Sequence, residues 1–390
     1  MTHSGGPAAA RRFKICHVIT CLELGGAQQN TLHTVTHLDR GRFEVALVSG
    51  VGGLLDKEAG AVADLALHWV PELVREIRPL ADLAALAHLT SIFRAMRPDV
   101  VHTHSSKAGI LGRWAAHLAG VPVRVHTIHG FGFHAQMSAL QRGCLTALEA
   151  GTAPLTTRFI AVSNANLERG VAAGIFARGQ ATLLRSGVAL GAFRNGARRG
   201  SLRADLGIPP EAPLVGMVAC LKPQKAPLDF VRVAGQVAAL VPEAHFLLVG
   251  DGALRGAVEE AIEAHSLAGR FHLLGWRRDI PSILKNLSLV ALTSRWEGLP
   301  RIVPEAMAAA LPVVATRVDG TPEAVEEGVT GFLAEPGDTA AMAARIGWLL
   351  RHPEQGRRMG RAGRERVDAF DIDAMVRRQE SLYAELLAHA

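Results

Sequence analysis

The feature that most constrains the fold of this chain is a repeated alternation of short apolar runs with longer amphipathic segments. In the first half, the apolar runs lie at residues 13–20, 43–50, 99–104, 123–129 and 158–163. Segments with helical periodicity lie between them, at residues 26–38, 80–96 and 108–118. Short buried strands that alternate with helices predict a parallel sheet covered by helices on both faces.

The same alternation begins again in the second half. Residues 191–201 are rich in glycine and arginine without periodicity, and we expect them to be a linker. The later apolar runs lie at residues 214–220, 245–250, 270–275, 287–293 and 311–316. The sequence therefore predicts two Rossmann-like, doubly wound α/β domains that face a central cleft. The expected N-terminal domain is 1–195 together with a C-terminal helix at about 371–390 that crosses back to it, and the second domain is 196–370.

Composition excludes several classes of protein. The formal charge of +6 and the pI near 9.5 favour a polyanionic partner or a mildly basic surface, but no Lys/Arg tract or zinc-finger spacing indicates nucleic acid. The four cysteines form no C-x-x-C pair, which indicates reduced thiols in a cytoplasmic protein. No apolar run is long enough for a signal peptide or a membrane span, so any membrane contact is expected to be peripheral.

The loop at 294–303 carries the clearest sign of a binding site. It follows the apolar run 287–293, and Pro304 is expected to be the first residue of the helix behind it. Backbone N–H groups and the helix dipole at such a point bind phosphate. Glu305 would accept hydrogen bonds from vicinal hydroxyls such as those of a ribose, and Glu297 would suit the hydroxyls of a group carried by the diphosphate.

Plainer interpretations stay open at this stage. Glu305 can simply complement the helix dipole, and Glu297 can be a solvated loop charge. Gly25 and Gly26 follow the first apolar run and either admit a phosphate or form an ordinary turn. The H-x-H pair in "VHTH" (101–104) is expected to have both imidazoles on one face of a strand. The two histidines are either metal ligands or structural residues.

The loop and its surroundings resemble a known family. "EGLPRIVPEAMAAALPVVATRVDGTPEAVEEGVTGFLAEPGD" (297–338) is similar to the Glu-x7-Glu region of family 4 of the retaining glycosyltransferases, which have the GT-B fold. Further segments resemble that family in the same order along nearly the whole chain, at 23–35, 121–130, 215–230, 245–255 and 271–284. Each segment alone is a weak signal, but the ordered set is specific.

The resemblance implies a role for each matching position. In the acidic loop, Glu305 would hold the nucleotide ribose and Glu297 would contact the donor sugar. Pro300 stands where many relatives have glycine and cannot donate a hydrogen bond. The amides expected to bind the diphosphate are therefore those of Leu299, Arg301 and Ile302.

The resemblance extends to the basic loop and the histidine strand. Lys225 matches a lysine that clamps the diphosphate, whereas Cys220 stands where the family has arginine, and Lys222 is a candidate substitute. His129 would lie near the donor sugar and the β-phosphate. We therefore expect His129, Lys225 and Glu297 to be the catalytic residues.

The remaining donor contacts are expected at turns. Gly25 and Gly26 match the glycine loop of the family, Gly250 lies in a turn beside the nucleotide, and the backbone of Arg277 would contact the base. For Gly250 and Arg277, a plain turn is the alternative. No metal ion and no cofactor other than the nucleotide-sugar co-substrate is implied.

The expected reaction is a retaining, metal-independent glycosyl transfer in surface polysaccharide synthesis. The donor is expected to be a nucleotide sugar, with UDP as the default nucleotide. The acceptor is expected to be a glycan linked to polyprenyl diphosphate. The segment 130–149 and the arginines of 75–97 are candidates for contact with an anionic membrane, or else form a packed helix. Three other readings stay open: a nucleotide-sugar 2-epimerase, a metal-dependent hydrolase that uses His102 and His104, and an inactive sensor suggested by Cys220.

Overall fold

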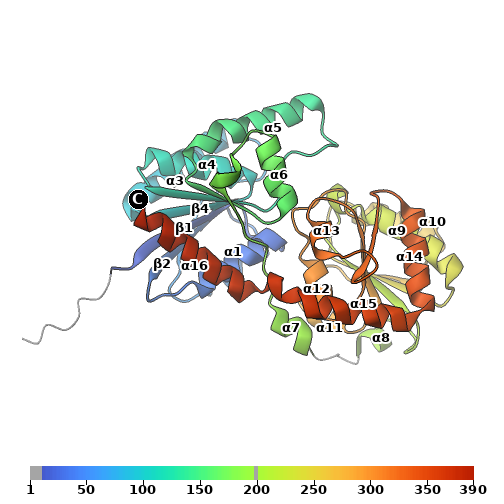
Figure 1. Ribbon diagram of the computed structural model, residues 1–390. Coiled ribbons are helices and arrows are strands. Elements are labelled where there is room, and N and C mark those ends of the chain that lie inside the picture. The colour runs from blue at the N-terminus through green and yellow to red at the C-terminus, as the bar shows by residue number, and fades with distance from the viewer. Residues whose placement is uncertain (1–10, 197–200) are drawn as a thin grey trace, which may run out of the picture. The chain divides into compact units, whose positions relative to one another are not determined.

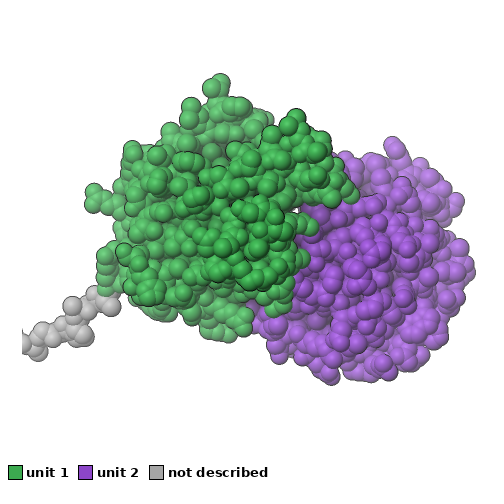
Figure 2. All heavy atoms as spheres, turned by 45° about the horizontal axis from the view of Figure 1, so that its top comes forward, with its two compact units in different colours: residues 1–186, 373–390 green, residues 187–372 purple. Residues whose placement is uncertain are grey.

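The computed structural model describes residues 11–196 and 201–390. The chain divides into two compact units, which Figure 2 colours separately: unit 1 is 1–186 with 373–390, and unit 2 is 187–372. Unit 2 ends at the first residue of the last helix, α16 (Ile372–Ala388), and the rest of α16 belongs to unit 1. The C-terminal helix thus rejoins the N-terminal unit, as the sequence predicted.

Unit 1 is built on a seven-stranded parallel sheet with the order β3-β2-β1-β4-β5-β6-β7. Its strands are β1 (Phe13–Ile19), β2 (Phe43–Ser49), β3 (Ala66–Trp69), β4 (Val100–His104), β5 (Val123–Ile128), β6 (Arg158–Ala161) and β7 (Ala181–Leu183). The parallel register pairs His17 of β1 with His102 of β4, so two histidines lie side by side in the middle of the sheet.

Helices cover both faces of this sheet, as predicted. They are α1 (Gly26–His37), α2 (Asp56–Gly60), α3 (Pro79–Met96), α4 (Ser106–Leu118), α5 (Ala139–Thr152) and α6 (Asn164–Ala172), with 3-10 turns η1 (Ala153–Leu155) and η2 (Arg178–Gln180). Figure 1 shows α3, α4 and α5 on one face of the sheet, and α1 and α16 on the other. Cys16, Val18 and Val101 belong to a buried apolar cluster with residues of α3 and α4. Because side chains alternate along a strand, His17 and His102 point to the opposite face, toward α16.

Unit 2 has a six-stranded parallel sheet with the order β10-β9-β8-β11-β12-β13. Its strands are β8 (Leu214–Val218), β9 (His245–Val249), β10 (Phe271–Leu273), β11 (Leu289–Leu292), β12 (Val313–Thr316) and β13 (Gly331–Ala334). Its helices are α7 (Leu190–Asn195), α8 (Ser201–Asp205), α9 (Pro227–Leu240), α10 (Arg255–Ala264), α11 (Ile280–Leu284), α12 (Ile302–Ala308), α13 (Thr321–Ala324), α14 (Thr339–Arg351) and α15 (Pro353–Arg366), with 3-10 turns η3 (Pro223–Lys225) and η4 (Val367–Phe370).

Two local predictions were wrong. Residues 191–201 were expected to be a linker, but Leu190–Asn195 form helix α7, because Leu190 and Phe193 lie one turn apart and are both buried; residues 197–200 lie outside the described part of the chain. Helix α12 begins at Ile302, so Pro304 is its third residue rather than its first. Proline is tolerated there because the first N–H groups of a helix have no partner within the helix.

The strand orders place a candidate site in each unit. The order of strands reverses between β1 and β4 in unit 1, and between β8 and β11 in unit 2. In open α/β sheets, ligands bind beyond the carboxyl ends of the strands at such a reversal. The loops after these four strands are therefore where binding groups are expected. Within 11–196 and 201–390, no helix combines the length and the apolar character needed to cross a bilayer.

Candidate functional site

In unit 2, the loops that follow β8 and β11 bring two predicted site residues into contact. The Lys225 ammonium donates to Oε1 of Glu297, and the Ser294 hydroxyl donates to the same oxygen at 2.6 Å. The side chain of Glu297 is only 5% exposed, and that of Lys225 is 18% exposed. The pair is thus a largely buried ion pair, in which the interaction between the charges is weakly screened by solvent.

Hydrogen bonds fix these two loops against each other. The Thr293 hydroxyl, at the end of β11, lies 3.0 Å from the carbonyl oxygen of Lys225. The amide of Gln224 donates to the carbonyl of Trp296 at 3.0 Å, and the N–H of Arg295 donates to the carbonyl of Gln224 at 2.7 Å. These bonds hold the two loops together, so that Lys225 and Glu297 lie within reach of each other.

Backbone strain occurs at the same place. Ala226 follows Lys225 directly and has φ of 44°, and Asp319 has φ of 40°. Asp319 accepts a hydrogen bond from the backbone N–H of Glu297 at 2.6 Å. Non-glycine residues in the left-handed region cost free energy and are concentrated at functional sites. One of these residues is the neighbour of Lys225 in the chain, and the other bonds to the backbone of Glu297.

The loop after Glu297 presents backbone donors. The backbone N–H groups of Gly298, Leu299 and Ile302 have no hydrogen-bond acceptor among the described residues. The side chain of Arg301 points elsewhere, since its Nε donates to the carbonyl of Gly187 at 3.1 Å. Leu299 and Ile302, two of the three residues whose amides were predicted to bind the diphosphate, therefore have open N–H groups, and so does Gly298.

Glu305 lies behind this loop in the first turn of α12 and is 9% exposed. Its Oε1 is 3.7 Å from the Arg301 guanidinium. Burial raises the pKa of Glu305, and the nearby Arg301 charge partly opposes that rise. Burial also lowers the pKa of Arg301. The carboxyl group is therefore an acceptor held close to a cation, at the end of the loop with open amides.

Gly250 and Arg277, two further predicted positions in unit 2, differ in whether their backbone groups are available for hydrogen bonds. Gly250 has φ of 131°, and a Cβ there would lie 2.0 Å from the carbonyl oxygen of Ala219. Its N–H already donates to the carbonyl of Gly275 at 2.8 Å, so glycine is required for the close approach of these loops. The Arg277 guanidinium forms two bonds of 2.8 and 2.7 Å to Asp279. The backbone N–H and C=O of Arg277 have no hydrogen bond within the described chain.

Lys222 precedes Lys225 on the loop after β8. Its N–H donates to the carbonyl of Cys220 at 2.9 Å, and its own carbonyl accepts from the N–H of Lys225 at 3.0 Å. Cys220 is a free thiol of intermediate exposure. The contact with Glu297 is made by Lys225, so the replacement of the absent arginine by Lys222 stays a prediction.

In unit 1, Gly25 precedes α1, and Gly26 is its first residue. The N–H groups of Gly26, Ala27 and Gln28 have no acceptor among the described residues. A Cβ at Gly25 would meet only the end of the Gln28 side chain, at 2.5 Å. The start of α1 thus offers a row of amides at the reversal between β1 and β4.

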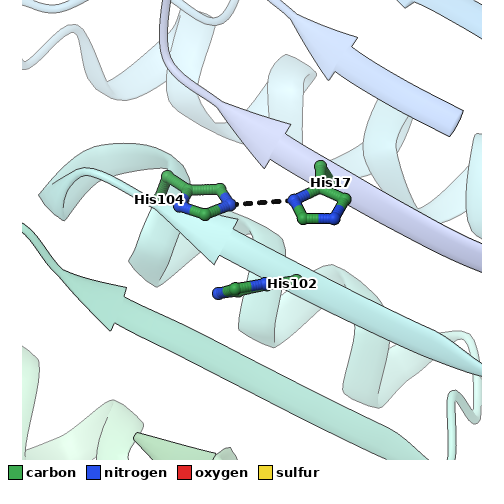
Figure 3. Close-up of side chains that lie close together, drawn as sticks. All are labelled: His17, His102 and His104. Atoms are coloured by element: carbon green, nitrogen blue, oxygen red, sulfur yellow. Dashed lines mark hydrogen bonds between the residues drawn. The ribbon is translucent and has the colours of Figure 1, made fainter. Parts of the chain in front are cut away.

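The predicted histidines of β4 and β5 belong to a buried network. His102 and His104 share a face of β4, as expected, and His17 of β1 joins them (Figure 3). Nδ1 of His17 lies 3.0 Å from Nε2 of His104, and Nδ1 of His104 lies 3.1 Å from Nε2 of His129. His129 follows β5 and is half-buried. His126 lies on the other face, where it contacts α4.

The second half of the network reaches the C-terminal helix. Nδ1 of His102 lies 2.5 Å from the Tyr383 oxygen, and its Nε2 lies 2.7 Å from the Thr127 hydroxyl. The same tyrosine oxygen is 3.4 Å from Nε2 of His17 and donates to Gln379 at 3.4 Å. Helix α16 therefore packs over the histidines and contributes the Tyr383 hydroxyl to their hydrogen bonds.

The three imidazoles also meet the spacing of a metal site, since their ligand atoms lie within 4.8 Å of one another. The sequence supplied His102 and His104 but not the third ligand, His17. All six ring nitrogens have hydrogen-bond partners within the protein. No carboxylate belongs to the cluster among the described residues, so nothing there would neutralise a buried dication. The geometry is that of a hydrogen-bonded network.

Comparison with known proteins identifies the family of this chain. Residues 25–187 match the glycosyl transferase 4-like domain family, and residues 199–366 match the glycosyl transferases group 1 family. The UDP-Gal:alpha-D-GlcNAc-diphosphoundecaprenol alpha-1,3-galactosyltransferase of Escherichia coli is 34% identical over 336 residues, 84% of this chain and 85% of that protein. The chain belongs to the GT4 family of glycosyltransferases.

Solved structures show that this GT4 glycosyltransferase has the GT-B fold. Anabaena HepE, in complex with UDP and glucose, superposes with a TM-score of 0.84 at 21% identity, over 96% of this chain and 100% of HepE. Sucrose-phosphate synthase from Thermosynechococcus elongatus gives a TM-score of 0.84 at 22% identity, over 97% and 100% of the two chains. The family and the fold predicted from the sequence are therefore confirmed.

Sequence reasoning missed two residues that contact Glu297 in unit 2 and two residues of the buried histidine network in unit 1 of this GT4 glycosyltransferase. Ser294 and Asp319 each bond to Glu297, but neither stands out in the sequence. His17 had a signal, because it is a polar residue inside an otherwise apolar run. Tyr383 had none, because its partners lie 281 and 366 residues away along the chain.

Proposed function

We propose that this glycosyltransferase transfers galactose from UDP-galactose to an N-acetylglucosamine carried on polyprenyl diphosphate, with retention at the anomeric carbon. The similarity to the E. coli galactosyltransferase over 84% of the chain supports this donor and acceptor. The structural observation that carries the proposal is the Lys225–Glu297 pair next to the open amides of Gly298, Leu299 and Ile302. Together these groups offer a cation and several N–H donors to a diphosphate. Their carboxylates can accept hydrogen bonds from sugar hydroxyls.

Each group of unit 2 has a role in the proposed donor complex. The diphosphate receives hydrogen bonds from the loop amides, and Lys225 balances its charge. Glu305 accepts hydrogen bonds from the ribose hydroxyls. The backbone of Arg277 pairs with the polar edge of the base. Glu297 keeps Lys225 in position and accepts from a hydroxyl of the donor sugar.

The proposed chemistry needs no protein nucleophile. The bond between the anomeric carbon and the diphosphate oxygen breaks, and the acceptor oxygen attacks from the same side. The departing diphosphate takes the proton of the acceptor hydroxyl. Catalysis then consists of stabilising the charge that develops on the leaving group, which Lys225 and fixed N–H donors do without reorganisation. The same groups supply the positive charge for which a metal ion would otherwise be used.

Glu305 provides a test of ribose binding. Glu305→Gln is expected to weaken UDP binding about 10- to 100-fold, because a hydrogen bond to a charged group contributes about 1.5–3 kcal/mol. Titration calorimetry with UDP measures the effect. The exposed Glu259→Gln is the matched control, and equal affinities of the two variants would remove Glu305 from the site.

The lipid-linked acceptor implies contact with a membrane surface. In unit 1, Leu80 and Leu83 of α3 are 86% and 65% exposed, and Leu140 of α5 is 77% exposed. Arg78 and Arg142 lie beside them in the sequence. Apolar side chains flanked by arginines are typical of segments that lie on anionic bilayers.

We expect the full chain to float with vesicles of anionic phosphatidylglycerol and not with neutral phosphatidylcholine. The double variant Leu80→Glu/Leu83→Glu should lose most of this binding. Leu240→Glu, which changes a 44% exposed leucine of unit 2, should keep it. Equal flotation of the wild-type protein and both variants would show that Leu80 and Leu83 do not contribute to membrane binding.

The proposed activity is tested with purified full-length protein, UDP-galactose and a synthetic N-acetylglucosaminyl diphosphate lipid. Mass spectrometry should detect one added hexose, and proton NMR should show an α linkage. Conversion of UDP-galactose to an epimer without acceptor would instead support the epimerase reading. Absence of any product with this donor and acceptor, together with product from another nucleotide sugar, would correct the donor and leave the reaction class intact.

A further inference from the structure

The segment 316–320, which connects β12 to α13, bonds to the loop that carries Glu297. Asp319 accepts a hydrogen bond from the backbone N–H of Glu297 at 2.6 Å. The N–H of Gly320 donates to the carbonyl of Gly298 at 3.1 Å. Two successive residues of the segment thus bond to two successive residues of the loop. All of them belong to unit 2, so this contact lies within one compact unit.

The bond from Gly320 fixes the direction of one open amide. The described residues have no cis peptide bond, and in a trans peptide the C=O and the N–H point to opposite sides. Since the carbonyl of Gly298 points to Gly320, the N–H of Leu299 points away from the segment 316–320. That N–H has no acceptor among the described residues, although Leu299 is only 6% exposed. The N–H of a buried residue rarely lacks a partner, so this is the side from which a ligand would approach.

The carboxylate of Asp319 fixes the preceding peptide group in the same way. Because the N–H of Glu297 points to Asp319, the carbonyl of Trp296 points to the opposite side. There the side-chain amide of Gln224, in the turn η3, donates to that carbonyl at 3.0 Å. The peptide group between Trp296 and Glu297 is thus held on both of its sides. The chain therefore enters the part of the loop with the open amides in one fixed direction.

The backbone of Asp319 indicates that its carboxylate is retained for a function. Its φ is 40°, in the left-handed region, where an L side chain costs free energy and glycine does not. The next residue, Gly320, has an ordinary φ of −77°, so the glycine of this turn is not at the position that needs one. A glycine at 319 would relax the turn but would lose the bond to Glu297. Strain of this kind is concentrated at ligand sites.

We propose that Asp319 is a positioning residue that holds this loop in the conformation in which the N–H groups of Gly298 and Leu299 receive the donor diphosphate. This rests on the glycosyltransferase activity proposed above. Asp319 acts through the peptide group between Trp296 and Glu297. Without the carboxylate, that peptide group loses its fixed direction, and the amides that follow must be ordered when the ligand binds. The cost of this ordering weakens the binding of the diphosphate.

The test compares three variants of the full-length protein by titration calorimetry with UDP. Asp319→Gly allows the left-handed conformation and removes the acceptor, so it should weaken UDP binding roughly 10- to 100-fold. Asp319→Asn also tolerates this conformation and keeps an acceptor oxygen, so it should retain most of the affinity. Ser266→Gly, at an exposed position of unit 2 with φ of 55°, changes backbone strain alone and should bind UDP as the wild-type protein does. Unchanged affinity in Asp319→Gly, or an equal loss in Asp319→Asn, would overturn the proposal.

Melting temperatures separate positioning from folding. In Asp319→Gly, the relief of backbone strain opposes the loss of one hydrogen bond. The segment also keeps the bond from Gly320 to Gly298 and the bond from the Thr316 hydroxyl to the carbonyl of Ser294, at 2.5 Å. The melting temperature of Asp319→Gly should therefore stay close to that of the wild-type protein. A large fall would show that the contact serves folding and would overturn the proposal.

Hydrogen exchange of the ligand-free protein adds a readout that needs neither donor nor acceptor. The amide of Glu297 should exchange slowly in the wild-type protein and in Asp319→Asn, and clearly faster in Asp319→Gly. Equal exchange rates in the wild-type protein and Asp319→Gly would overturn the proposal. Failure of the wild-type protein to bind UDP would overturn the proposal together with the diphosphate site. Binding of UDP without any transfer of sugar would refute only the proposed reaction.

Discussion

Lys225→Met is expected to lower kcat by about 10²- to 10³-fold, with a much smaller change in the KM for the donor. The ammonium of Lys225 is the cation that the structure ties to Glu297 on the loop with the open amides. Loss of one preorganised donor to a developing anion typically costs this much in kcat. The effect falls on kcat because the charge on the leaving diphosphate grows in the transition state. Steady-state rates with UDP-galactose and the lipid-linked acceptor measure it.

Among the described residues, this variant leaves the buried carboxylate with the Ser294 hydroxyl as its side-chain partner, so its effect on stability must be separated from its effect on catalysis. Removal of one partner of a buried ion pair typically costs about 3–5 kcal/mol. The double variant Lys225→Met/Glu297→Gln removes both charges and should regain most of the melting temperature without regaining activity. Lys285→Met, elsewhere in unit 2, should be active. Recovery of kcat by the double variant would show that Lys225 serves only to neutralise Glu297.

Mild acid is expected to destabilise unit 1 by several kcal/mol between pH 7.5 and pH 5.5. Burial lowers the pKa of four histidines in its core, and that of His17 falls to about 3 from an ordinary value of 6.5. The other three are His102, His104 and His126. Below pH 6.5 the unfolded chain takes up protons that the folded chain does not, so stability falls as the pH decreases toward 3. Each histidine that stays uncharged in the folded protein adds to this loss, because the same side chain in the unfolded chain takes up its proton near pH 6.5.

Hydrogen exchange of the amides of β1 and β4 reports the free energy of opening of unit 1 at the two pH values. His117→Gln, which changes an exposed histidine of α4, should show the same dependence on pH as the wild-type protein. His126→Gln, on the face of β5 toward α4, should show a smaller one. An opening free energy that does not change down to pH 5.5 would mean that the buried imidazoles are charged in the folded protein.

The sequence was most informative about the central strands. β1, β2, β8 and β9 appear as largely apolar runs because both of their faces are covered by helices. β3, β7 and β13 were not predicted. They are three or four residues long and lie at the edges of their sheets. β3 and β7 are only partly buried, so their sequences hardly differ from those of loops. β13 is buried, but its four residues are too few to show a period.

The site was predictable where a motif is local. Glu297 and Glu305 could be found because the loop, the helix and both acids lie within one short segment. The contact of Lys225 with Glu297 follows only from the adjacency of β8 and β11, which periodicity does not give. In the same way, the line from His17 to His129 depends on the register of β1, β4 and β5. Those relationships are properties of the sheet and not of any single segment.

A crystal structure of the full chain with UDP tests the central claim most directly. The expected result is a diphosphate within hydrogen-bonding distance of the amides of Gly298, Leu299 and Ile302 and of the Lys225 ammonium, with the ribose hydroxyls on Glu305. UDP bound at another place, or bound in unit 2 without any of these contacts, would contradict it.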